Sequence, residues 1–146
     1  MVGKGMSGLY AAPAVSESDR QAAEAILQAV GQTRWVATEA GIDDVIAISG
    51  SGPAYVFHFV EALEATGRQL GFDEATAREL ALATFEGAIE LLRQSGEPAG
   101  DLKRKVMSKG GTTERAIASF EADGVAEAIV RCALACRARA VEMSEE

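Results

Sequence analysis

Residues 73–95, DEATARELALATFEGAIELLRQS, form the most informative stretch of this chain. Asp73 is a favourable N-cap, and the residues after it predict one long helix that ends near Ser95. Its apolar residues fall on two stripes, one through Leu80, Ala88 and Leu91 and the other through Leu82, Phe85, Ile89 and Leu92. Because a helix that is apolar on most sides has to be buried, other elements must surround this one.

The remaining helical sequence is too short to surround that helix within one chain. A helix beginning at Pro53, where the fixed φ of proline suits a helix start, is expected to end near Gly67 or Gly71. Further helices are predicted at residues 98–107, 113–122 and 125–143. A second copy of the chain is therefore expected to cover the apolar stripes, and we predict an obligate homodimer.

The first 39 residues differ in character from the rest. The segments MSGLYA (6–11) and TRWVATE (33–39) both predict strands. Between them, residues 16–31 predict an amphipathic helix that Ser16 and Asp19 open with a spacing like that of a capping box. A β-α-β unit of this size cannot cover both faces of a sheet, so it is expected to be the edge of a larger domain. The predicted fold class is mainly α.

Composition excludes several classes of function. The formal net charge is −8, and the 14 Lys and Arg residues are scattered along the chain. This argues against a nucleic-acid partner and against a polybasic membrane contact. No apolar stretch approaches the roughly 20 residues that span a bilayer, and no signal pattern opens the chain, so a cytoplasmic location is expected.

Cys132 and Cys136 lie four residues apart on the apolar stripe of the last predicted helix. No third or fourth ligand is near them in sequence, and the chain has a single His, so no metal site is expected. Buried structural thiols are the better interpretation of this pair.

The stretch GKGMSG (3–8) fits the dinucleotide fingerprint G-x-G-x-x-G. Its context argues against a nucleotide site. No strand precedes Gly3, and an apolar run stopped by Pro13 follows, in place of a helix whose N-terminus could bind a pyrophosphate.

The stretch SGSGPAY (49–55) is better placed to bind an anion. Ser49, Gly50 and Ser51 precede the predicted helix start at Pro53, where unpaired N–H groups and the positive end of the helix dipole would face outward. A plain tight entry into a buried helix would use the same residues, and both interpretations stay open.

The stretch SKGGTT (108–113) has similar ingredients. Gly110 and Gly111 allow unusual φ or close contact, and Thr112 and Thr113 are candidate caps for the helix that follows. Lys109 adds a cation. Such a loop could bind a carboxylate or a phosphate, although an ordinary N-cap turn would use the same residues. Two loops of this kind in one small acidic domain favour a binding role.

His58 lies within two turns of the first loop and is the candidate proton donor. A packed or surface histidine is the alternative interpretation. No other residue stands out as catalytic.

Four segments carry a resemblance to a known family: GMSGLYA, ISGSGPAYVF, SGEPAGDLKRKVMS, and GGTTERAI followed by FEADGVAEAI. In this order, over essentially the whole chain, the sequence resembles the C-terminal part of pyrroline-5-carboxylate reductase. Enzymes of that family reduce the cyclic imine Δ1-pyrroline-5-carboxylate to L-proline with NADPH or NADH. The resemblance implies a Rossmann domain followed by a helical domain that forms an interlocked homodimer, with dimers assembling further into rings.

By this resemblance, residues 1–39 would be the last elements of the Rossmann domain, and residues 40–146 the all-helical dimerisation and substrate-binding domain. The loop at Gly110, Gly111, Thr112 and Thr113 would bind the carboxylate of the small imine substrate. The turn at Ser49, Gly50 and Ser51 would shape the pocket near the nicotinamide. The family often has Pro where this chain has Lys109, and it has Thr or an apolar residue at the position of His58, so it assigns no proton donor.

The nucleotide-binding half of such enzymes has no counterpart in this sequence. The chain is therefore expected to be a fragment or truncated form of the reductase, inactive alone and binding neither NADPH nor NADH tightly. The alternative is a non-catalytic helical dimerisation module that associates with full-length reductase. A third option is an imine reductase for another small carboxylated ring.

Overall fold

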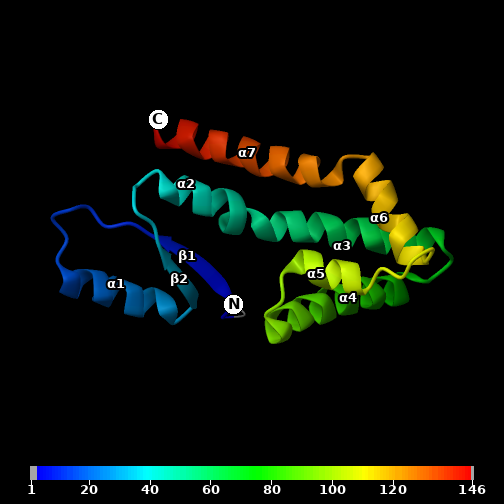
Figure 1. Cartoon of the computed structure of the whole chain (residues 1–146). Helices are drawn as coiled ribbons and strands as arrows, with labels where there is room; N and C mark the ends of the chain where they lie inside the picture. The colour runs from blue at the N-terminus through cyan, green and yellow to red at the C-terminus, as the bar shows by residue number, and fades with distance from the viewer. Residues whose placement is uncertain (1–2, 146) are drawn as a thin grey trace. The chain divides into compact units, whose positions relative to one another are not determined.

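The computed structural model describes residues 3–145 and is drawn whole in Figure 1. The elements are β1 (Gly5–Leu9), α1 (Glu17–Gln28), β2 (Gly31–Trp35), α2 (Gly41–Val45), the π-helical turn η1 (Ile46–Gly50), α3 (Gly52–Gln69), α4 (Glu74–Ser95), α5 (Ala99–Lys105), α6 (Thr112–Ala122) and α7 (Val125–Ser144). This order confirms the predicted fold class, mainly α with a small β element at the start. The chain forms two compact units: the first contains the residues up to Ala54 and those from Ile129 onward, and the second is Tyr55–Ala128.

Two parallel strands open the first unit, and α1 connects them (Figure 1). Gly5 lies opposite Gly31, so closely that a Cβ added to Gly31 would lie 2.2 Å from the carbonyl oxygen of Gly5. Helix α1 begins where predicted, because the Ser16 hydroxyl accepts a hydrogen bond from the N–H of Asp19 at 3.2 Å. The predicted bounds of β2 are wrong by a few residues: the strand begins at Gly31 and ends at Trp35 instead of running over residues 33–39.

An almost unbroken run of helix follows the sheet. Only Ser51 separates η1 from α3, and its N–H donates to the carbonyl oxygen of Ile46 at 2.9 Å. The predicted helix start at Pro53 is confirmed to within one residue, since α3 begins at Gly52 and Pro53 is its second residue. π-helical turns are rare and occur frequently at functional sites.

Within the first unit, α7 packs against the α2–η1 segment (Figure 1). Arg137 Nε lies 2.5 Å from Asp44 Oδ1, and Cys136 Sγ lies 3.1 Å from Ser51 Oγ. Two successive residues of α7 thus contact residues on either side of η1.

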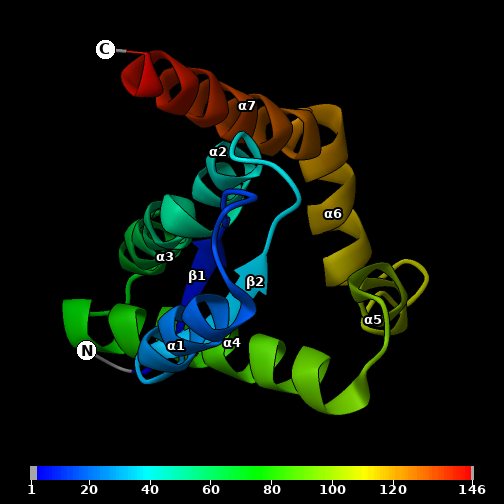
Figure 2. The same cartoon turned by 90° about the vertical axis from the view of Figure 1, so that its left-hand side faces the viewer.

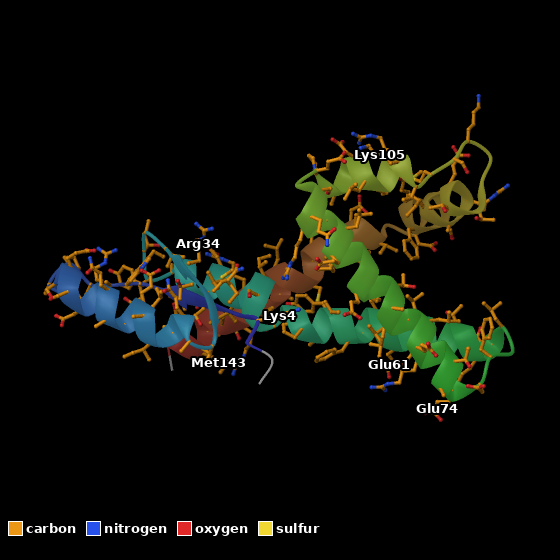
Figure 3. All side chains as sticks on the ribbon, turned by 90° about the horizontal axis from the view of Figure 1, so that it is seen from below. Lys4, Arg34, Glu61, Glu74, Lys105 and Met143 are labelled. Carbon is orange, nitrogen blue, oxygen red and sulfur yellow. The ribbon has the colours of Figure 1, made fainter. Side chains whose placement is uncertain are left out.

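The second unit consists of helices joined by short turns. Asp73 caps α4 as predicted, accepting a hydrogen bond from the N–H of Thr76 at 2.8 Å. Near this turn α3 and α4 touch, and a Cβ added to Gly67 would lie 2.8 Å from the Cβ of Ala77. Farther from the turn α4 diverges from α3, which leaves both helices uncovered along much of their length (Figure 3).

Little of the chain is buried. Among residues 3–145, the buried hydrophobic side chains are Leu9, Ala47, Ala77 and Ala81. Along the apolar stripes of α4, Leu80, Leu82, Ile89 and Leu91 are each between 44% and 50% exposed. The single chain therefore does not surround the helix that its sequence requires to be surrounded.

Candidate functional site

The loop between α5 and α6 is a tight β-turn. The two helices that it joins run in different directions (Figure 2), and Lys103 of α5 pairs with Glu121 of α6 at 3.8 Å. In the turn, the N–H of Gly111 donates to the carbonyl oxygen of Ser108 at 2.9 Å, and Gly110 has a φ of 74°. A positive φ at the third position is typical of a type II turn, where glycine is favoured.

Both glycine amides of this loop are hydrogen-bonded within the chain. The N–H of Gly111 binds Ser108, and the N–H of Gly110 donates to Glu114 Oε2 at 2.7 Å. These two amides are therefore not free to bind the carboxylate that is expected at this loop. Their role is to form the turn, because a Cβ added to Gly111 would lie 2.3 Å from Ser108 Oγ.

Available amides lie instead in the first turn of α6. The N-cap residue is Gly111, and no side chain caps the helix, so the predicted capping role of Thr112 and Thr113 is wrong. These threonines are the first two residues of α6, and their N–H groups have no i−4 carbonyl partner inside the helix. The helix start thus combines two amides, two hydroxyls and the positive end of the helix dipole, which together suit a carboxylate.

Two charged residues adjoin this helix start. Lys109 is exposed and occupies the second position of the turn, where type II turns favour Pro. The Glu114 carboxylate lies in the first turn of α6, where a negative charge complements the dipole but also repels an anionic ligand.

The second candidate stretch lies at the end of η1. Ser49 lines an open cavity of about 530 Å³ together with Arg34 of β2 and Thr38. Ser51 follows the π turn, and its hydroxyl accepts a hydrogen bond from the Cys136 thiol. Hydroxyl and guanidinium groups around a cavity can bind a small polar ligand. This stretch belongs to the first unit, whereas Gly110–Thr113 belong to the second.

His58 lies on α3 in the second unit, and its side chain is 82% exposed. Its Nδ1 is 3.9 Å from Oε2 of Glu61, the residue labelled on α3 in Figure 3. This is a surface pair on one helix, which gives His58 no contact specific to catalysis.

The prediction of two buried thiols is wrong for the single chain. Cys132 is exposed and Cys136 is half-buried. The apolar stripe that they share lies on a helix that the rest of the chain covers only in part. Within residues 3–145, no group of three or more His, Cys, Asp or Glu side chains comes together in a way that could hold a metal ion.

The glycines of GKGMSG do not form a phosphate loop. Gly5 and Gly8 lie inside β1, not in a turn between a strand and a helix, and α1 begins only at Glu17. This stretch thus offers no backbone cradle of the kind that binds a dinucleotide pyrophosphate.

Among residues 3–145, no helix is long and apolar enough to cross a membrane.

Sequence reasoning missed the roles of Glu114, Cys136 and Arg137. The spacing from Gly111 to Glu114 is that of a capping box, and this signal could have indicated Glu114. The contacts of Cys136 and Arg137 reach residues 85 and 93 positions away, and no local pattern indicates them. The Asp44 carboxylate accepts a hydrogen bond from the guanidinium of Arg137, and this contact raises the pKa of Arg137 above its usual value.

Comparison with known proteins gives consistent matches. Residues 39–143 match the family described as pyrroline-5-carboxylate reductase dimerisation. The pyrroline-5-carboxylate reductase of Pseudomonas aeruginosa is 44% identical over 144 residues, which are 98% of this chain and 52% of that protein. Pyrroline-5-carboxylate reductase 2 of Bacillus subtilis is 36% identical and is matched over 98% of this chain and 51% of its own length. The chain thus spans about half the length of the curated relatives it matches.

Solved structures agree with the sequence matches. A pyrroline-5-carboxylate reductase from Coxiella burnetii superimposes with a TM-score of 0.90 at 38% identity, covering 97% of this chain and 52% of that one. A pyrroline carboxylate reductase from Plasmodium falciparum, solved with NADP bound, gives a TM-score of 0.89 at 28% identity, covering 94% of this chain and 52% of that one.

Proposed function

Since the chain belongs to the pyrroline-5-carboxylate reductase dimerisation family, we propose that it supplies the dimerisation and substrate-carboxylate-binding part of an enzyme that reduces Δ1-pyrroline-5-carboxylate to L-proline with NADPH or NADH. In this proposal residues 1–39 are the last elements of a Rossmann domain, and residues 40–146 are the helical domain. The match over residues 39–143 supports a homodimer. A biosynthetic reaction of this kind favours a cytoplasmic location.

The start of α6 is the single observation that carries the substrate-binding role. Its N-cap has no side-chain hydrogen bond, so the amides of Thr112 and Thr113 are available to a carboxylate. Gly110 and Gly111 hold the turn that leads the chain into this helix. A carboxylate placed there gains charge-assisted hydrogen bonds and the favourable dipole.

Ser49, Gly50 and Ser51 are the second stretch that we propose to bind the substrate. Ser49 and Gly50 end the π turn, and Ser49 borders the cavity that Arg34 and Thr38 also line. In the proposed enzyme the hydroxyls of Ser49 and Ser51 would orient the ring of the substrate. Bound NADPH or NADH would supply the hydride.

Substitution of Thr112 tests the amide directly. Thr112 is the first residue of α6, a position that tolerates Pro, and Gly111 before it has the extended backbone that precedes a proline. Thr112→Pro therefore deletes one N–H while retaining the helix, and Thr112→Ala deletes only the hydroxyl. We expect the proline variant to weaken binding of L-proline to the purified chain roughly tenfold or more, and the alanine variant to change it far less. Equal affinities of wild type and Thr112→Pro would refute the amide site.

A chimeric enzyme tests the activity. The 144 matching residues of the Pseudomonas aeruginosa reductase would be replaced by those of this chain. We expect the chimera to oxidise NADPH or NADH on addition of Δ1-pyrroline-5-carboxylate. A chimera that folds, dimerises and binds the nucleotide but does not reduce the imine would contradict the proposal.

The second candidate is a non-catalytic dimerisation module that associates with full-length reductase. The exposed apolar stripes of α4 favour it, because they fit any subunit that carries the same helix. Co-expression with a tagged full-length relative distinguishes the two: stable mixed dimers would support this role, and exclusive self-pairing would exclude it.

A further inference from the structure

We infer that Cys136 is a positioning residue for the Ser51 hydroxyl. A contact from α7 thus orients one of the side chains that we propose to bind the substrate. The inference rests on the proposed function, because it concerns a residue of that same site. Cys136 itself does not touch the substrate in this account. It acts by fixing the orientation of the side chain that does.

Both backbone polar groups of Ser51 are hydrogen-bonded within the chain. Its N–H donates to Ile46 at 2.9 Å, and its carbonyl oxygen accepts from the N–H of Ala54 at 3.0 Å. The remaining freedom of the residue is the rotation of its hydroxyl. Cys136 Sγ lies 3.1 Å from Ser51 Oγ, within hydrogen-bond distance for sulfur.

This contact gives the Ser51 hydroxyl a direction. When the thiol donates its hydrogen to Oγ, the hydrogen of the hydroxyl is left free to donate elsewhere. The rotation of such a serine is already restricted before a ligand binds. Binding a ligand to its hydroxyl hydrogen therefore costs less conformational entropy. The thiol thus prepares Ser51 to bind an acceptor atom of the substrate.

A second contact from the same helix fixes the whole segment. Arg137, the neighbour of Cys136, pairs with Asp44 of α2 at 2.5 Å. The two contacts hold the segment on either side of η1, which is the least regular helix of this unit. A π turn held at both ends keeps the orientation of the residues that leave it.

A double-mutant cycle tests this inference on the chain as purified, with the dissociation constant of L-proline as the readout. Cys136→Val and Ser51→Ala are each expected to weaken binding roughly fivefold, the effect of losing one hydrogen bond. Because Cys136 acts through Ser51, the double variant is expected to bind no more weakly than Ser51→Ala alone. A merely structural role of Cys136 would instead weaken both backgrounds equally, and that result would overturn the inference.

Two further variants complete the test. Cys136→Ser retains a donor to Ser51 and is expected to bind as wild type. Cys132→Val removes the exposed thiol on the same helix and is expected to change nothing. Binding by the wild type together with unchanged affinity in Cys136→Val would refute the positioning role alone. Absence of L-proline binding by the wild type would refute the proposed function, and the positioning role with it.

Discussion

Phe57 lies on α3 and is 69% exposed in the single chain. It borders an open groove of about 570 Å³ between α3 and α4, which Val60, Leu82 and Phe85 also line. Such an apolar groove suits a helix of a second copy, and residues 39–143 match a dimerisation family. We predict that Phe57→Ala weakens the homodimer without unfolding the chain, since alanine favours helix more than phenylalanine does.

The magnitude follows from the exposed area. A phenylalanine side chain of roughly 200 Å² that is 69% exposed has about 140 Å² left to bury, of which alanine retains a part. Loss of about 100 Å² at about 25 cal/mol per Å² costs about 2.5 kcal/mol in one copy. A twofold dimer contains the change twice, so the cost is about 5 kcal/mol, and Kd should rise by a factor of roughly 10³ to 10⁴.

Sedimentation velocity over a wide range of concentration measures this Kd. Ile26→Ala is the matched control, because Ile26 is 72% exposed but lies on α1, outside the residues that match the dimerisation family. We expect this control to dimerise as the wild type does, and circular dichroism should show the same helix content in all three proteins. A Kd for Phe57→Ala equal to that of the control, or a wild type that is monomeric at every concentration, would refute the reasoning.

Three further predictions concern stability, measured by urea unfolding. Gly110→Ala should destabilise the chain by about 1–2 kcal/mol, because Gly110 has a φ of 74°. Lys109→Pro should stabilise the chain by about 0.4–1 kcal/mol. A stabilising Gly110→Ala together with a destabilising Lys109→Pro would exclude a type II turn. Gly31→Ala should destabilise strongly, because its Cβ would lie 2.2 Å from the backbone of Gly5; unchanged stability would contradict the strand pairing. The hydrogen bond from the N–H of Thr76 lowers the pKa of the Asp73 carboxyl. The stability that the cap contributes is therefore present above the unfolded-state pKa and is lost as pH falls through the folded-state pKa. An Asp73→Ala variant that is still less stable than the wild type in acid would argue against the cap.

Local patterns predicted most of the helices. Ser16 and Asp73 cap α1 and α4 as their spacing indicated, because a cap involves only residues within one turn of each other. The start of α3 was also predicted to within one residue, from Pro53, but the helical turn that precedes it was not. Proline marks a favourable helix start, but the helical segment before Pro53 continues into it through a π turn, which has no sequence signature of its own.

The substrate-binding role of residues 110–113 stays a prediction, and the structure corrects the hydrogen bonds expected of them. Glycines and threonines at 110–113 indicated an anion-binding site, yet the amides of Gly110 and Gly111 donate hydrogen bonds to Glu114 and Ser108. Hydrogen-bond potential can be read from residue types. Which acceptor each amide finds depends on turn geometry and on the direction of the next helix, and these are properties of the folded backbone.

The sequence by itself determined that this chain is mainly helical and that its α4 helix needs a partner, because periodicity and apolar content are local properties of the chain. Only the tertiary structure decided that Cys136 and Arg137 meet Ser51 and Asp44, residues 85 and 93 positions away. Such contacts depend on how separate elements pack, and packing is set by the sum of many weak interactions along their length. No single stretch of sequence encodes it.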